Sequence, residues 1–138
     1  MKLNVFCEEV KSPKVTKKLI KEIVTLISIE EETIFDDINI IFCSDDYLLN
    51  INNEYLQHDY YTDIITFDYK NENSVSSDMF ISLDRVQENS NSIKIPFNHE
   101  LLRIIIHGVL HLSGYEDDTV EKRQSMSLKE DYYLAKIF

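Results

Sequence analysis

Glycine is almost absent from this sequence, which contains two glycines among 138 residues where average usage predicts about ten. Both of them, Gly108 and Gly114, lie in one short stretch that also contains histidines. A chain of this length is typical of one domain with a full core, and its hydrophobic content of 43% excludes the disordered class. We therefore expect one domain over residues 1–138, whose unusual backbone positions are concentrated in a single segment.

Long apolar runs and a cysteine framework are also missing. No apolar run reaches the roughly eighteen residues that a membrane span needs, and the amino-terminal segment has no apolar core typical of a signal peptide. Cys7 and Cys43 are too few for a disulfide framework, so we expect two reduced, buried thiols. Together these absences predict a cytoplasmic protein.

Basic residues are scarce and unevenly placed. The chain has 14 basic and 25 acidic residues, a net charge of −11. Six of the basic residues lie within positions 1–21, and none occurs between positions 22 and 69. The sequence therefore lacks the broad basic surface of a self-sufficient nucleic-acid binder. Binding of RNA would depend on the lysine-rich amino-terminal segment, on a metal ion or on a partner.

Hydrophobic periodicity predicts four strands and five helices. The strands are expected at 2–7, 36–43, 64–69 and 79–83, with a polar loop at 70–77 that allows the last two to pair. The helices are expected at about 12–28, 44–57, 84–91, 96–113 and 119–136. The last helix has an apolar face formed by Val120, Met126, Leu128, Tyr132 and Tyr133. This order predicts an α+β fold with a mixed four-stranded sheet packed with helices.

The helix expected at 96–113 is apolar around most of its circumference, which is typical of a buried helix. Four polar residues recur on it at spacings of three and four and form one stripe, namely Glu100, Arg103, His107 and His111. Burial of such groups is costly unless each has a partner. We therefore expect this stripe to bind a ligand or to face a cleft.

His107 and His111 have the spacing at which two imidazoles reach one metal ion. Gly114 can adopt the backbone conformation that ends a helix and turns the chain, which would bring Asp117 toward the same ion. Two imidazoles, one carboxylate and an open fourth position form a known catalytic zinc arrangement. Gly108 would allow a strand or loop to pack closely on the helix. In zinc proteases the residue directly after the first histidine is the general-base glutamate, and because Gly108 stands there, peptide hydrolysis is disfavoured.

The segment His107-Gly-x-Leu-His-Leu-x-Gly-Tyr115 resembles the signature of the YbeY family, the metal-dependent endoribonucleases of ribosomal RNA maturation. Residues 62–67 are similar to the central Thr-Asp-Val-Leu-Ser-Phe block of that family, and residues 77–82 to its Gly-Asp-Ile strand. The resemblance implies a zincin-like metal helix and one zinc ion per chain. It also implies cleavage of single-stranded RNA in the maturation of the 16S ribosomal RNA of the small subunit. It also implies a part in ribosome quality control, with ribosomal or assembly proteins as further partners.

Two positions depart from the family pattern. Asp117 stands where the family usually has a third histidine, and its negative charge would make the metal less Lewis-acidic. Glu116 and Asp118 are adjacent carboxylates that could take the same role. Leu56 stands where the family usually has an arginine that is expected to contact phosphate.

Arg103 is the nearest replacement for that arginine by helix spacing, and His58 is the second. We therefore assign Arg103 a catalytic role in countering phosphate charge. Thr62 and Asp63 could belong to the site or only to a hydrogen-bonded turn. The tyrosine pairs at 60–61 and 132–133 could stack on single-stranded bases or form half-buried faces.

The main hypothesis is a zinc-dependent endoribonuclease whose metal is held by His107, His111 and Asp117. One alternative is a non-catalytic ribosome-assembly factor with a structural metal. A closed site would favour that alternative, with a fourth ligand from Asp118, His58 or His99. A weaker alternative is a metallohydrolase that acts on a small molecule in an enclosed pocket.

Overall fold

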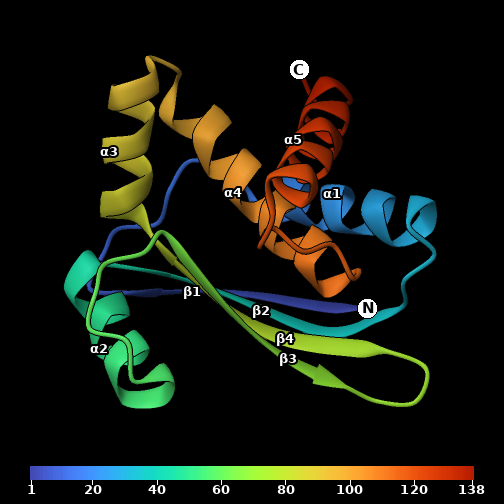
Figure 1. Ribbon diagram of the computed structural model, residues 1–138, viewed down its shortest axis with the longest axis horizontal. Coiled ribbons are helices and arrows are strands. Elements are labelled where there is room, and N and C mark those ends of the chain that lie inside the picture. The colour runs from blue at the N-terminus through green and yellow to red at the C-terminus, as the bar shows by residue number, and fades with distance from the viewer.

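The computed structural model describes residues 1–138 as a four-stranded sheet with helices on both faces (Figure 1). The strands are β1 (Lys2–Glu8), β2 (Phe35–Cys43), β3 (Ile64–Lys70) and β4 (Val75–Ser82). The helices are α1 (Lys17–Glu30), α2 (Asp45–Leu56), α3 (Leu83–Ile93), α4 (Phe97–Leu112) and α5 (Val120–Ala135). The sheet order is β1-β2-β4-β3, in which β3 is antiparallel to β4 and the other pairs are parallel. The expected α+β fold with a mixed sheet is confirmed.

The main core lies between one face of the sheet and the helices α1, α3, α4 and α5, which Figure 1 shows on the same side. Side chains alternate across a strand, so every second residue of the central strands faces these helices. The buried hydrophobic residues that β2 and β4 contribute to this core are Phe35, Ile38, Ile40, Phe42, Met79 and Ile81. On the opposite face α2 covers a smaller cluster, formed by Cys43, Leu48 and Ile65.

Several element boundaries differ from the expectation, two of them by four residues or more. The first helix begins at Lys17 rather than at position 12, because Thr16 is its N-cap and accepts a hydrogen bond from the backbone N–H of Leu19 at 3.2 Å. Strand β4 begins at Val75 rather than at position 79, so half of the loop expected at 70–77 lies in strands β3 and β4. Pairing with strands on both sides outweighs the low strand propensity of this polar segment. Helix α3 also extends one residue earlier and two later than expected.

Two burial predictions were wrong in part. Cys43 is buried as expected, whereas Cys7 is exposed, because the carboxyl-terminal half of the edge strand β1 is left uncovered. On α5, Val120, Leu128 and Tyr132 are exposed. The buried face of this helix is formed by Met126, Glu130, Tyr133 and Leu134.

None of the five helices is long and apolar enough to cross a membrane.

Candidate metal centre

Helix α4 is surrounded by other elements, and ten of its residues are buried. It packs against α1, α3 and α5 and also against β3 and β4. Gly108 makes the approach to the strands possible, because a Cβ atom there would lie 2.4 Å from Met79 Cε and 2.7 Å from Ile64 Cδ1. The close packing expected at Gly108 is therefore confirmed, and it fixes the helix against the sheet.

A sharp turn follows α4 and folds the chain back toward it. Gly114 has φ +105°, a conformation that residues with a side chain rarely adopt. The backbone N–H of Tyr115 donates to the carbonyl of Leu110 at 3.1 Å and closes the turn. Asp117 then reaches back, and its Oδ2 lies 3.3 Å from His107 Nε2 and 3.6 Å from His111 Nε2. The turn thus brings together the three residues that the spacing selected.

The ring nitrogens of His107 and His111 are arranged for binding a cation. Each Nδ1 contacts an acceptor. His107 Nδ1 lies 2.7 Å from Glu130 Oε2, and His111 Nδ1 lies 2.8 Å from the carbonyl oxygen of Tyr115. In the neutral rings Nδ1 therefore carries the proton, and the two Nε2 lone pairs face one another at 3.0 Å.

Three acceptor atoms thus meet at one point, and they can be satisfied together only by a positive charge between them. The donor atoms of His107, His111 and Asp117 all lie within 4.8 Å of one another. Two imidazoles and a carboxylate form a donor set that zinc and similar divalent ions accept. These three residues could therefore hold a metal ion.

Buried carboxylates and an arginine support the histidines from behind. Glu100 is fully buried and accepts from Arg103 Nε at 2.7 Å and Nη2 at 2.6 Å. Glu130 is also buried and accepts from Arg103 Nη1 at 2.8 Å. Each charged group of the stripe on α4 therefore has a partner of opposite charge, which removes most of the cost of burial.

The electrostatics of this network favour an ionised Glu130. Burial alone would raise the pKa of Glu130, but hydrogen bonds from His107 and Arg103 outweigh it and hold the pKa below its usual value. Burial lowers the pKa of His107, but the hydrogen bond to Glu130 and the negative charges of Glu130, Asp117 and Asp63 together raise this pKa above its usual value. An ionised Glu130 accepts the Nδ1 proton of His107 and orients its Nε2 toward the site, as carboxylates commonly do behind metal-binding histidines.

Asp63 directly precedes β3, close enough to the site for the charges of His107 and Arg103 to act on it. Burial raises the pKa of Asp63, and these two positive charges only partly offset the effect. Its carboxylate also accepts a long hydrogen bond from Asn89 at 3.5 Å. The structure thus places near the metal centre a carboxylate whose role the sequence left open.

The other candidate ligands lie outside this group. Lys122 pairs with Glu116 at 2.7 Å and with Asp118 at 3.2 Å. His58 Nδ1 contacts the Tyr60 hydroxyl at 3.0 Å, and His99 stacks on Phe138 with ring centroids 4.8 Å apart. Leu56, at the end of α2, is 40% exposed.

Glu130 is not among the residues that the sequence pattern selected, although its contacts to His107 and Arg103 make it central to the site. Glu130 follows Met126 by one turn of α5 and precedes Tyr133 and Leu134. A carboxylate on the face shared by these three buried residues was the available signal. It was obscured because exposed apolar residues such as Leu128 gave α5 a second apolar stripe.

Comparison with known proteins gives a consistent result. The sequence matches the family described as Endoribonuclease YbeY over residues 4–138. A protein of that name from Parabacteroides distasonis is 42% identical over 135 residues, which cover 98% of this chain and 95% of the relative. Another, from Bacteroides fragilis, is 44% identical and covers 93% of this chain and 92% of the relative. The solution structure of TM1509 from Thermotoga maritima superposes with a TM-score of 0.67 at 29% identity, over 96% of this chain and 86% of that one.

Proposed function

The chain belongs to the Endoribonuclease YbeY family, and on this basis we propose that it is a zinc-dependent endoribonuclease specific for single-stranded RNA. The proposed substrate is the 16S ribosomal RNA of the small subunit. We propose that it is cleaved in the cytoplasm during maturation of this RNA and during ribosome quality control. Ribosomal or assembly proteins are the proposed partners. The proposed catalytic domain comprises residues 1–138, with one zinc ion held by His107, His111 and Asp117.

The observation that carries this proposal is the convergence of two Nε2 atoms and one carboxylate oxygen at a single point. A zinc ion bound there would act as a Lewis acid toward the phosphodiester and would activate water for its hydrolysis. The chain's own residues prepare the site: Glu130 orients His107, and the carbonyl of Tyr115 orients His111. The turn at Gly114 supplies the third donor, Asp117.

The number of protein ligands supports catalysis rather than a purely structural metal. The candidate group has three members, and a structural zinc site almost always has four protein ligands. Asp118, His58 and His99 are engaged by Lys122, Tyr60 and Phe138, respectively. A three-residue site leaves a coordination position for water or for a phosphate oxygen.

The catalytic role of Arg103 stays a prediction. Its guanidinium donates to both Glu100 and Glu130, so much of its charge is compensated within the protein. Its side chain is still 30% exposed. We propose that this exposed part attracts the phosphate, while the paired part keeps Glu130 in place behind His107.

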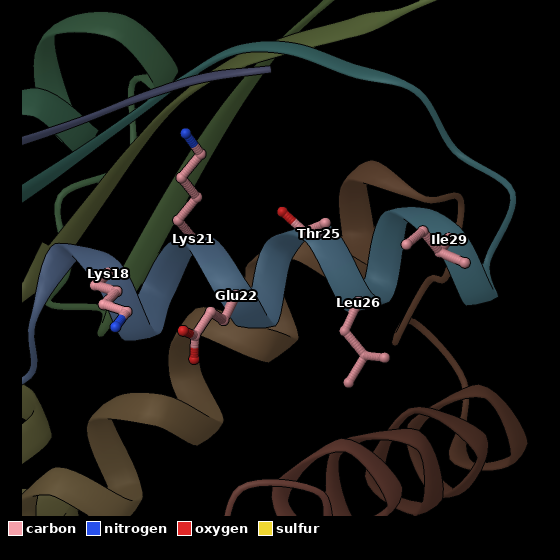
Figure 2. Close-up of a pocket in the computed structure, with 6 residues that line it drawn as sticks. All are labelled: Lys18, Lys21, Glu22, Thr25, Leu26 and Ile29. Atoms are coloured by element: carbon pink, nitrogen blue, oxygen red, sulfur yellow. The ribbon is translucent and has the colours of Figure 1, made fainter.

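A chain with a net charge of −11 needs a local attraction for RNA. We propose that the lysine-rich side of α1 contributes to it. A hollow of about 490 Å³ lies along this helix and is lined in part by Lys18 and Lys21 (Figure 2). RNA could contact these lysines through its phosphates without base-specific contacts.

The experiment that tests the proposed function combines metal analysis with RNA cleavage. We expect the purified protein to contain close to one zinc or other divalent ion per chain and to cut single-stranded RNA. His107→Ala should lose both properties, whereas the control His99→Ala should keep them. A protein without metal, or a His107→Ala variant that retains metal and cleavage, would contradict the proposal. Metal retained without cleavage of ribosomal RNA, with ribosome association intact, would favour the assembly-factor alternative.

A further inference from the structure

Glu31 occupies an unfavourable position for an acidic residue. It is the C-cap of α1, and it lies between Glu30 and Glu32 at a helix end that has no basic residue in its last turn. Carboxylates at a helix carboxyl terminus oppose the helix dipole. An acidic residue at a position where the helix dipole disfavours it is expected to make compensating contacts with other parts of the structure.

The carboxylate of Glu31 accepts three hydrogen bonds from distant parts of the chain. The Tyr115 hydroxyl donates to Oε1 at 2.7 Å, and Lys129 Nζ donates to Oε2 at 3.1 Å. The hydroxyl of Tyr133, a fully buried residue, also donates to Oε2. The side chain of Glu31 is only 9% exposed, so these contacts replace most of its hydration.

One of these partners, Tyr115, is held at both ends. Its hydroxyl is fixed by Glu31, and its backbone carbonyl accepts the Nδ1 proton of His111 at 2.8 Å. Tyr115 also lies in the turn between His111 and Asp117. A displacement of its ring would therefore move both the acceptor that orients His111 and the segment that carries Asp117.

We propose that Glu31 is a positioning residue for the metal centre: by fixing Tyr115, it orients His111 Nε2 and holds the turn that presents Asp117. This inference rests on the proposed function, since it assumes that His111 and Asp117 bind the metal. Glu31 does not touch the metal-binding atoms, and it acts from a helix more than 80 positions away in the sequence.

A parallel pair of residues provides a matched control. The Tyr132 hydroxyl donates to Glu30 Oε1 at 2.5 Å, and this hydrogen bond joins α1 to α5. Neither residue of this pair is hydrogen-bonded to the turn that carries Asp117. Glu30→Gln and Tyr132→Phe therefore make the same chemical changes as Glu31→Gln and Tyr115→Phe. They leave intact the hydrogen bonds that link Glu31 to His111 through Tyr115.

The test measures Zn²⁺ affinity by chelator competition and the visible absorption spectrum of the Co²⁺-substituted protein. We expect Glu31→Gln and Tyr115→Phe to weaken Zn²⁺ binding about 10-fold, the lower end of the effect of residues that support metal ligands. Both should also change the Co²⁺ spectrum, which reports ligand geometry, while Glu30→Gln and Tyr132→Phe leave affinity and spectrum unchanged. Thermal unfolding of each metal-free variant separates this effect from a loss of folding, and Tyr115→Phe provides a second variant should Glu31→Gln unfold.

The outcomes distinguish the inference from the proposed function. If the wild-type protein binds zinc while Glu31→Gln and Tyr115→Phe bind it within about 2-fold of wild type with unchanged Co²⁺ spectra, Glu31 has only a structural role and the inference is overturned alone. If the wild-type protein binds no divalent metal, the proposed function is overturned and the inference with it. Equal losses in the control pair would also contradict a specific path through Tyr115.

Discussion

Single residues on α4 and α5 decide whether two histidines become a metal site. His107 and His111 are close in any helix, but their Nε2 atoms converge here because an acceptor engages each Nδ1. The acceptor for His107 is Glu130, a buried carboxylate that Arg103 also holds. Removal of the charge of Glu130 therefore tests the site without altering any of the three candidate ligands.

Glu130→Gln is expected to weaken zinc binding about 10- to 100-fold, which is the usual effect of losing a carboxylate behind a metal-binding histidine. The amide can present its NH₂ group to His107 and would then favour the wrong ring tautomer. Chelator competition measures the effect, and Glu121→Gln, on the exposed part of α5, is the control. Equal affinities of Glu130→Gln and Glu121→Gln would show that Glu130 does not orient His107.

Among the elements, a capping side chain marks a helix start in the sequence only where no competing signal precedes it. The helix expected at 44–57 does begin after Ser44, which accepts a hydrogen bond from the backbone N–H of Tyr47 at 3.1 Å. The first helix was misplaced because Ser12-Pro13 imitates such a start, while Thr16 provides the actual cap. Strand β4 was predicted too short because its polar first half is stabilised by pairing with β2 and β3, which a local pattern does not show.

An ion pair joins α2 to α3, and its contribution to stability should depend on pH. Arg85 Nη2 lies 2.7 Å from Asp45 Oδ2, and the Ser82 hydroxyl donates to Asp45 Oδ1 at 2.7 Å. Burial alone would raise the pKa of Asp45, but the hydrogen bonds from Arg85 and Ser82 hold it below the ordinary value of 3.8. The carboxylate therefore stabilises the fold fully above that value, and this contribution is lost as the pH falls through the lowered pKa.

We expect Asp45→Asn to lower the free energy of unfolding by about 1–2 kcal/mol at neutral pH. Asp46→Asn is the matched control, because Asp46 lies in the same first turn of α2 but does not pair with Arg85. Urea denaturation at a series of pH values should show the difference between the two variants shrinking below about pH 4. A difference that stays constant into strong acid would contradict the assignment.

For the whole molecule, the uneven distribution of charge determines where an acidic protein can attract RNA. Lys18 and Lys21 line the hollow along α1, and Glu31, the C-cap of α1, accepts a hydrogen bond from the Tyr115 hydroxyl in the turn that carries Asp117. The lysines and the site are thus connected by one helix.

The double variant Lys18→Glu/Lys21→Glu is expected to bind single-stranded RNA about 10-fold more weakly at moderate salt. The slope of log affinity against log salt concentration should fall by about 1.4, since each phosphate contact on a single strand contributes about 0.7. Binding is measured in the His107→Ala background, so that cleavage does not interfere. Lys94→Glu/Lys136→Glu makes the same change in net charge on α3 and α5, and an equal loss in that control would mean that only net charge matters.

The elements, the mixed sheet and the frame formed by His107, His111, Gly114 and Asp117 could all be predicted from the amino-acid sequence. These features depend on periodicity, capping and spacing within short segments, which the linear chain records directly. The two glycines could be read in the same way, since Gly108 permits close packing and Gly114 permits a positive φ.

The residues that hold these candidate metal ligands in place became apparent only from the packing of the helices. Glu31, the C-cap of α1, and Glu130 on α5 lie far in sequence from the histidines that they support, and their local patterns do not show which residues they contact. Their roles follow from burial and from hydrogen bonds across packed helices. Such contacts exist only once the sheet and the helices have assembled, because long-range packing rather than local spacing brings these atoms together.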